Sequence, residues 1–401
     1  MHEDLLTFHA HAVAGVTRDR RRYLFDQLDW NARSLCVTGA RGVGKTTMLI
    51  QHYFDRYDDP RRCLYLSCDN IRVMSAGLLT IARDHFAYGG EALILDEVHK
   101  YPDWSQEVKN ILDTYKDRRV LLSGSSTLDL TKARHDLSRR VAYHSLAGLS
   151  FREYLHFRHG IEREAIPLER ILKDHVSLAA ALVPTVPVLK YFADYLAEGY
   201  YPYFLEGSAD YLNKVLGSIE KVLYEDIAVS FNLTQPKVPV LKKLLWLIAS
   251  SHPFVPNMDG LASDLGVSRP FVYTALDILE MAGLVITVRP AATGARSVRK
   301  PGKVYFENTN LLQAIVGAVR GAAEIGTVRE TFFFNQVRLS RRVGLHPAVD
   351  FVIDDQYLFE VGGPSKKGGQ DGAAKNGYLA IDGIEVGAGN RIPLWLFGML
   401  Y

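Results

Sequence analysis

The stretch GARGVGKTT at residues 39–47 constrains this chain more than any other. It follows a short apolar run, RSLCVTG (33–39), and leads into the helix-length segment KTTMLIQHYFDRY (45–57). Its spacing fits GxxxxGK(S/T), in which glycines let backbone N–H groups wrap around phosphate oxygens without obstruction by a Cβ. The helix that follows directs its N-terminal partial positive charge at the same anion. The sequence therefore predicts a nucleotide-binding loop between a strand and a helix.

The loop supplies candidate contacts to ATP and to Mg²⁺. Lys45 is expected to place its ammonium on the β- and γ-phosphates, and Thr46 to offer its hydroxyl to Mg²⁺. ATP, its product ADP and Mg²⁺ are accordingly the expected ligands. The predicted nucleotide-binding residues are Gly39, Ala40, Arg41, Gly42, Val43, Gly44, Lys45, Thr46 and Thr47.

A second element, ALILDE at residues 92–97, is an apolar run that ends in two adjacent carboxylates. Asp96 suits the role of holding Mg²⁺ through water. Glu97 suits the role of polarising the water that attacks the γ-phosphate, because adjacent residues at a strand end can divide these tasks. The pair is predicted to be catalytic, since it follows a phosphate-binding loop in the same run of strands.

Two further candidates follow along the chain. The next apolar run ends in SGSS (123–126), where Ser125 or Ser123 is expected to sense the γ-phosphate by a hydrogen bond. Arg139 and Arg140 stand just before a weaker fifth strand. One of them is a candidate arginine finger, a cation that stabilises transition-state charge and is worth roughly 10³–10⁵ in rate.

The order of strand-like and helix-like segments predicts the architecture. Apolar runs alternate with helical patterns up to residue 150, which is typical of a parallel sheet covered on both faces. The expected parts are a P-loop ATPase domain (1–150), a lid-like helical subdomain (151–236), a winged-helix domain (237–302) and a C-terminal domain (303–401). A chain of 401 residues is long enough for several such cores.

Composition excludes some classes of function. The formal net charge is only +2, so any contact with nucleic acid must come from a local basic patch. The longest apolar run, SLAAALVPTVPVL (177–189), is shorter than the roughly 20 residues that a membrane-spanning helix needs. The N-terminus lacks the pattern of a secretory signal, and Cys36, Cys63 and Cys68 form no metal-ligand pair. A cytoplasmic protein with reduced cysteines and no membrane contact is expected.

Residues 258–285 have the form of a helix–turn–helix, and residues 287–303 read as a basic hairpin wing. Such a hairpin suits contact with phosphates. The second helix is a poor reader of bases, because Arg269 is its only cation and two acids oppose phosphate. DNA binding through this unit is expected to involve the backbone with little sequence reading. The candidate DNA contacts are Arg269, Arg296, Arg299 and Lys300.

These motifs, in this order, resemble the prokaryotic AAA-type ATPases that carry a C-terminal domain of unknown function. The resemblance implies a winged helix after the ATPase domain, a restriction-endonuclease-like α/β domain at the C-terminus, and a recurrent arginine that falls on Arg140. The implied fold class is therefore α/β: a P-loop NTPase domain with a parallel sheet comes first, and a restriction-endonuclease-like α/β domain comes last. The helical subdomain and the winged helix lie between them in the chain. The stretches that carry it are GARGVGKTT, ALILDEVHKYPDWSQEVKNILD, VLLSGSSTLDL, DLSRRVAYHSLAGLSFREYL, EGYYPYF, KVYFENTNLL, EVGGPSKK and IDGIEVGAGNRIPLWLFGMLY.

The segment DFVIDDQYLFEVGGPSKK (350–367) nearly matches the D…ExK outline of a metal-dependent nuclease. Such a site needs carboxylates to hold Mg²⁺ and a lysine to orient the attacking water. Glu330, Asp350 and Glu360 are the candidate acids. Gly362, however, stands where the lysine belongs.

A lysine from the loop that follows, Lys366 or Lys367, is expected to be poorly positioned. The C-terminal domain is therefore predicted to retain a nuclease-like fold without the activity, as a docking or recognition surface. The interpretation favoured by the whole sequence is an ATPase whose nucleotide state repositions the winged-helix and C-terminal domains, on DNA or on a protein partner, with an oligomer left open. The alternatives are a metal-dependent DNA nuclease gated by ATP, and a DNA- or protein-binding regulator whose nucleotide is structural.

Overall fold

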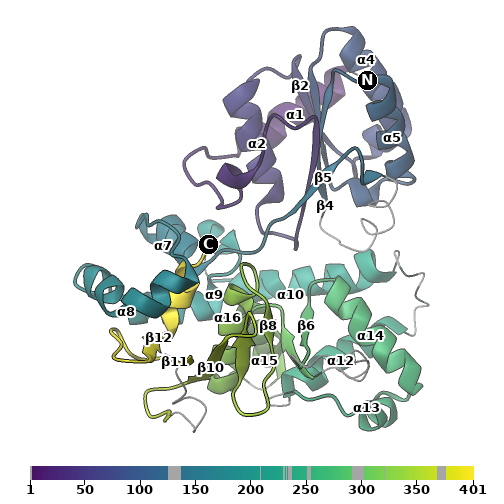
Figure 1. Cartoon of the computed structure of the whole chain (residues 1–401). Helices are drawn as coiled ribbons and strands as arrows, with labels where there is room; N and C mark the ends of the chain where they lie inside the picture. Colours follow the sequence, from purple (N-terminus) through teal and green to yellow (C-terminus); the bar gives the residue numbers. More distant parts are fainter. Residues whose placement is uncertain are drawn as a thin grey trace. The chain divides into compact units, whose positions relative to one another are not determined.

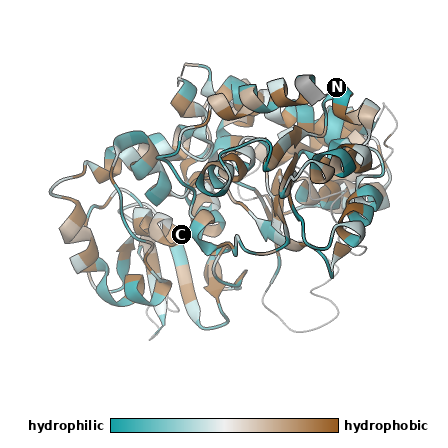
Figure 2. Ribbon diagram, turned by 90° about the horizontal axis from the view of Figure 1, so that it is seen from above, coloured by the Kyte–Doolittle hydropathy of each residue, from teal (hydrophilic) through white to brown (hydrophobic). Residues whose placement is uncertain are grey.

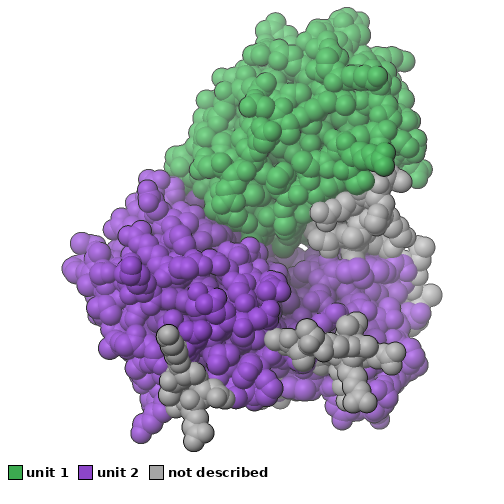
Figure 3. All heavy atoms as spheres, in the orientation of Figure 1, with its two compact units in different colours: residues 1–147 green, residues 148–401 purple. Residues whose placement is uncertain are grey.

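The protein is described by a computed structural model in which two compact units are separated at Ala147 and Gly148. Unit 1 comprises Met1–Ala147 and unit 2 comprises Gly148–Tyr401 (Figure 3). The structure describes residues 2–124, 137–207, 209–228, 231, 233, 237–250, 254–290, 302–319, 321–367 and 376–401.

Unit 1 is built on a five-stranded sheet in the order β2-β3-β4-β1-β5, and every neighbouring pair is parallel. This confirms the predicted P-loop NTPase sheet. Strands β1 to β4 are mostly apolar and buried because helices cover both sides of the sheet (Figure 1), and Figure 2 shows the hydrophobic character of the strands. Strand β5 is more exposed. The strands are β1 (Ser34–Thr38), β2 (Cys63–Ser67), β3 (Ala92–Asp96), β4 (Arg119–Gly124) and β5 (Ala142–Ser145).

Alternate residues of these strands point to opposite faces. One face, with Leu66, Leu95 and Leu122, packs in a buried cluster that includes Ile81 and Ile111 from two helices. Polar residues lie instead at or near the carboxyl ends of these strands: Ser67, Asp96 and Ser123. The helices of unit 1 are α1 (His2–Ala14), α2 (Lys45–Arg56), α3 (Ile71–Ala76), α4 (Leu78–Ala87) and α5 (Trp104–Thr114), with 3₁₀ turns at Phe25–Gln27 and Val98–Lys100.

Unit 2 begins with helices and continues through a helix pair and a two-stranded antiparallel ladder. Gly266 adopts φ +65° between α13 and α14, which a turn of this kind requires. The residues of the predicted wing from 291 to 301 lie outside the described part of the chain, so the winged helix stays a prediction. The elements are α7 (Phe151–His159), α8 (Leu168–Leu182), α9 (Val188–Glu198), α10 (Tyr211–Lys221), α12 (Val238–Ser250), α13 (Met258–Leu265), α14 (Arg269–Met281), β6 (Val285–Val288) and β7 (Lys303–Phe306), with a 3₁₀ turn at Pro202–Glu206 and a π-helical turn at Val222–Ile227.

A second five-stranded sheet, in the order β12-β11-β10-β9-β8, forms the C-terminal part of unit 2. It is mixed: β10 pairs parallel with β11 but antiparallel with β9. The helix that packs on β10 contributes Phe333 to an aromatic core with Phe351, Phe359 and Phe397. The elements are α15 (Thr309–Val319), α16 (Ile325–Val337), β8 (Val343–Gly344), β9 (Phe351–Ile353), β10 (Tyr357–Gly362), β11 (Gly377–Ile381), β12 (Arg391–Pro393) and a 3₁₀ helix at Leu394–Met399.

The stretch KVYFENTNLL supplies a buried polar network inside unit 2. Glu307 accepts hydrogen bonds from Tyr200 Oη (2.9 Å) and from the guanidinium of Arg338 (2.6 Å). Asn310 Oδ1 accepts from the backbone N–H of Tyr200 (2.6 Å) and from Tyr211 Oη (2.6 Å). Because buried polar groups are costly unless paired, this network ties the helical part of unit 2 to α15 and α16. Within the described chain, no helix is both long and apolar enough to span a bilayer.

Candidate nucleotide site

The loop between β1 and α2 has the backbone conformation that its glycines predict. Gly39 and Gly44 adopt φ +152° and +98°, values that side chains disfavour. A Cβ at Gly39 would also collide with the carbonyl oxygen of Leu146, which follows β5. The loop is therefore held tightly against the end of the neighbouring strand.

Lys45, the first residue of α2, folds its side chain back over this loop. Its ammonium donates hydrogen bonds to the carbonyl oxygens of Gly39 (3.0 Å) and Ala40 (2.9 Å), and the residue is only 5% exposed. These carbonyls accept hydrogen bonds that phosphate oxygens could accept in their place. The ammonium of Lys45 thus already lies at the loop that the motif predicts to bind phosphate.

Asp96 is the polar centre of the site. Its Oδ2 accepts hydrogen bonds from Thr46 Oγ1 (2.7 Å) and from Tyr65 Oη (2.8 Å), and its Oδ1 accepts one from Ser123 Oγ. The carboxylate is buried, with the residue 3% exposed. Three strands and α2 therefore converge on one carboxylate, which brings the two sequence motifs together as expected from their order.

Glu97 follows directly but has a different environment. Its backbone is left-handed, with φ +52°, and its N–H donates to Ser123 Oγ at 3.3 Å. Its carboxylate lies 3.5 Å from Nε2 of His99 and is 21% exposed, so it is the more accessible of the two acids. The sharp turn after β3 thus separates a buried carboxylate from an accessible one.

The serine at the end of β4 that the structure describes is Ser123. It touches both Asp96 and the backbone of Glu97, so a change at either acid would reach it directly. Ser125, the other candidate sensor, lies outside the described residues.

Arg140 lies near the amino ends of the strands, whereas the phosphate loop lies at their carboxyl ends. It precedes β5 (Ala142–Ser145), whose first residue pairs with Leu35 near the start of β1, whereas the loop follows the end of β1. The five residues of β1 span about 16 Å, and this length separates the start of the strand from the phosphate loop. Its guanidinium makes a two-pronged ion pair with Asp113 (2.7 and 2.9 Å) and thereby lowers the pKa of that carboxyl. This position does not bring Arg140 to the phosphate loop of its own chain.

Two residues of this site were not predicted. Arg22 is 4% exposed and donates hydrogen bonds to the carbonyl oxygens of Val43, inside the phosphate loop, and of Ala147 (2.8 Å). Tyr65 reaches Asp96 from the edge strand β2. The signals were present as RDRRRYL and CLYLSCD, but nothing local distinguishes these residues from a surface arginine and a core tyrosine.

Of the candidate DNA contacts, the structure describes Arg269 alone. It forms an exposed ion pair with Asp259 (3.2 Å), and such pairs contribute little to stability. The other three, Arg296, Arg299 and Lys300, lie outside the described residues.

The C-terminal acids lie around the hairpin of the mixed sheet. Glu330 accepts hydrogen bonds from Lys303 Nζ (3.1 Å) and Tyr305 Oη (2.5 Å), and burial together with this carboxylate raises the pKa of Tyr305. Asp350 accepts from the backbone N–H of Val361 (2.9 Å). Within the described parts of the chain, no three acid, histidine or cysteine side chains are grouped closely enough to hold a metal ion by themselves.

The expectation that a loop lysine would be poorly positioned is wrong for Lys366. Its ammonium lies 3.4 Å from Glu360 Oε2 and 3.9 Å from Asp350 Oδ2. A Cβ at Gly362 would lie 2.8 Å from both Cβ and Cγ of Lys366, so the glycine leaves the room that the lysine stem occupies. Arg391 fixes the loop by donating to the carbonyl oxygens of Pro364 (2.7 Å) and Lys366 (2.8 Å).

The fold of unit 1 is that of a P-loop NTPase, and residues 31–155 match a family described as AAA domain. Residues 189–320 match a domain of unknown function (DUF8612). The chain is 27% identical over 376 residues to the uncharacterized protein MJ1637 of Methanocaldococcus jannaschii, covering 89% of this chain and 76% of that protein.

Two solved structures show weak overall similarity. AMPPCP-bound DnaA from Aquifex aeolicus is 14% identical with a TM-score of 0.28, covering 64% of this chain and 84% of that chain. The S. cerevisiae Hsp104–ADP complex is 14% identical with a TM-score of 0.27, covering 84% of this chain and 55% of that chain. Similarity at this level establishes no shared ligand or activity.

Proposed function

We propose that unit 1 binds MgATP and hydrolyses its β–γ phosphoanhydride bond, and that the nucleotide state repositions unit 2. The observation that carries the proposal is the 2.7 Å hydrogen bond between Thr46 and Asp96, beside Lys45. A hydroxyl and a carboxylate at the start of a P-loop helix are oxygen ligands of the kind Mg²⁺ prefers, with water and phosphate completing its coordination. This donor set fits the cation, and Mg²⁺ when bound would neutralise charge on the β- and γ-phosphate oxygens.

The residues of the chain then divide the work. Lys45 exchanges its two backbone carbonyl partners for phosphate oxygens, and the N-terminus of α2 adds its partial positive charge. Glu97 orients a water in line with the γ-phosphate and accepts its proton as the new P–O bond forms. The bond between the γ-phosphorus and the bridging oxygen breaks, and ADP leaves with the electron pair. Ser123 is placed to report the change at both acids.

Two contacts connect the loop to the residues that precede unit 2. The N–H of Leu146 donates to the carbonyl oxygen of Thr38 (2.7 Å), and Leu146 packs against Gly39. Arg22 joins Val43 to Ala147, the last residue of unit 1. A loop that rearranges around phosphate would pull on both contacts. We propose that these contacts transmit the change in the phosphate loop to unit 2. The basic wing or the C-terminal domain of unit 2 would then engage DNA or a protein partner.

The direct test is release of inorganic phosphate from ATP by the full chain. Turnover that requires Mg²⁺ and stops in EDTA supports the proposal. Nucleotide binding with no turnover would instead favour the third interpretation, a regulator in which the nucleotide is structural.

Arg22→Ala is expected to separate nucleotide binding from its effect at the unit boundary. Hydrogen exchange with and without an ATP analogue and Mg²⁺ should show protection of residues 39–47 in both proteins, but a nucleotide-dependent change at residues 145–151 only in the wild type. Arg21→Ala is the matched control, because that neighbouring arginine pairs with Asp55 (2.8 Å) away from the loop. An undiminished response at residues 145–151 in Arg22→Ala would contradict the proposed route.

A second candidate function, metal-dependent cleavage of a phosphodiester, is favoured by one observation. Lys366 brings an ammonium to the two acids of the hairpin, where a loop lysine was expected to be poorly positioned. With a divalent cation on Asp350 and Glu360, the lysine would orient a water for attack on phosphorus. The attacking water would give its proton to solvent, the P–O3′ bond would break, and the leaving oxygen would take a proton from solvent.

Cleavage of supercoiled plasmid DNA in Mg²⁺ or Mn²⁺ tests this second function. Asp350→Ala and Lys366→Ala are expected to lower nicking at least about 100-fold, because each removes a group that the mechanism needs. Lys367→Ala is the control, since that neighbour is exposed. Absence of nicking by the wild type, or nicking that survives Asp350→Ala, would leave the C-terminal domain as the docking surface predicted from the sequence.

A further inference from the structure

Building on the proposed function, we propose that Tyr65 is a positioning residue for the metal-binding carboxylate: its hydroxyl holds Asp96 in the orientation that Mg²⁺ requires. The hydroxyl donates to Asp96 Oδ2 at 2.8 Å, the same oxygen to which Thr46 donates at 2.7 Å. Tyr65 belongs to neither sequence motif of the site.

The register of the sheet explains how the tyrosine reaches this carboxylate. Strand β2 pairs parallel with β3, with Tyr65 opposite Ile94 and Ser67 opposite Asp96. Tyr65 and Asp96 therefore lie on the same face of the sheet, because residues two apart share a face. The ring extends along the strands toward their carboxyl ends, and the hydroxyl arrives at the acid.

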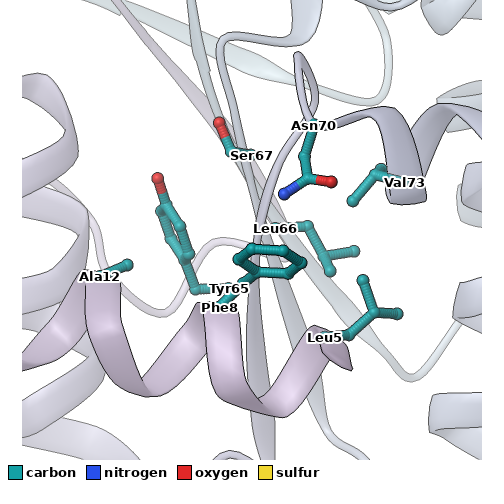
Figure 4. Close-up of a pocket in the computed structure, with 8 residues that line it drawn as sticks. All are labelled: Leu5, Phe8, Ala12, Tyr65, Leu66, Ser67, Asn70 and Val73. Carbon is teal, nitrogen blue, oxygen red and sulfur yellow. The ribbon is translucent and has the colours of Figure 1, made fainter. Parts of the chain in front are cut away.

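Tyr65 is held in place from the N-terminal helix. Its backbone N–H donates to Nδ1 of His9 at 2.9 Å. Figure 4 shows its ring beside Phe8 and Ala12 of α1, where these residues line a pocket of about 160 Å³. The residue is 8% exposed, and burial, reinforced by the negative charge of Asp96, raises the pKa of the phenol.

The two hydroxyls on Oδ2 would have different roles when nucleotide binds. Thr46 would offer a lone pair of its oxygen to the cation, and its O–H could still donate to Asp96. Tyr65 and Ser123 need not move, so they continue to hold the two oxygens of the carboxylate. A phenylalanine at this position would fill the same core volume, and the hydroxyl is what it would lack. Replacing Tyr65 by phenylalanine therefore tests the hydroxyl alone.

Tyr65→Phe tests this proposal through the response to Mg²⁺. Binding of a fluorescent mant-ATP is titrated with Mg²⁺, and binding in EDTA is measured separately. The variant is expected to need roughly 3- to 10-fold more Mg²⁺ for half-maximal effect, the loss expected for one hydrogen bond of typical strength. Affinity in EDTA should be unchanged, because the hydroxyl of Tyr65 donates to Asp96, which belongs to β3 and not to the phosphate loop.

Tyr57→Phe is the matched control. That tyrosine is also buried, but its hydroxyl accepts a hydrogen bond from Arg119 (3.0 Å) and it caps the far end of α2. A general loss of folding would alter binding in EDTA and would not be confined to the Mg²⁺ response. An Mg²⁺ response in Tyr65→Phe that matches the wild type, or is stronger, overturns the positioning role.

The same titration separates this proposal from the proposed function. If the wild type binds mant-ATP in an Mg²⁺-dependent manner without releasing phosphate, hydrolysis fails and the positioning role is still decided by the shift in Tyr65→Phe. If the wild type shows no Mg²⁺ dependence of binding, the positioning role is refuted.

Discussion

Glu97→Gln is expected to lower the rate of ATP hydrolysis by about 10²–10⁴-fold while ATP remains bound, which is the range for loss of a general base. Glutamine has the size of glutamate but cannot accept the proton of the attacking water. Glu97 is also the accessible acid of the pair, whereas Asp96 is buried under three hydroxyl donors. The substitution should therefore leave the metal-binding carboxylate and the phosphate loop as they are.

Phosphate release under saturating MgATP measures the first effect, and mant-ATP binding measures the second. Glu91→Gln provides the control, because that glutamate pairs with Arg62 (2.7 Å) outside the site. Turnover at the wild-type rate in Glu97→Gln would refute the role of the general base. Loss of nucleotide binding together with turnover would show instead that Glu97 supports the fold of the turn after β3.

Lys45→Ala is expected to weaken ATP binding by roughly 10- to 100-fold, the range for loss of a hydrogen-bonded charge, and to abolish measurable turnover. Lys45 is nearly buried and its ammonium already lies at the carbonyls of Gly39 and Ala40, in the loop that the motif predicts to bind phosphate. Direct titration with mant-ATP gives the change in affinity.

Lys116→Ala is the comparison for this experiment, since Lys116 is exposed between α5 and β4 of the same unit. Equal affinity in Lys45→Ala and the wild type would place the nucleotide elsewhere or make its binding independent of the phosphate loop. The two functions also separate here: a plasmid-nicking activity of the C-terminal hairpin would survive Lys45→Ala unless ATP gates it.

The local motifs predicted a large part of unit 1. A phosphate loop needs glycines, a lysine and a hydroxyl at fixed spacing within one turn, so residues 39–47 could be read directly from the chain. The ALILDE run could be read for the same reason, because a buried strand has a simple apolar pattern. That both motifs meet at one carboxylate follows from the rule that parallel strands end at a common edge of the sheet.

The hairpin of unit 2 contains a contact that the motif did not predict. Gly362 was read as the loss of a catalytic lysine, because a motif compares fixed positions along the chain. In the folded structure the same glycine makes room for Lys366, whose loop is fixed by Arg391 from a strand 25 residues farther along the chain. Position in space, not position in the motif, determines which cation reaches the two acids.

Contiguous segments of the sequence carry their own chemistry: the phosphate loop, the two carboxylates after β3 and the alternation of strands and helices that folds into a parallel sheet. The distant side chains that join these segments are known from the folded structure alone. Tyr65 reaches Asp96 through strand register, Arg22 reaches Val43 and Ala147, and Arg140 is paired with Asp113 near the amino ends of the strands. Such contacts depend on packing between segments far apart in the chain, which the spacing of residues within a motif does not encode.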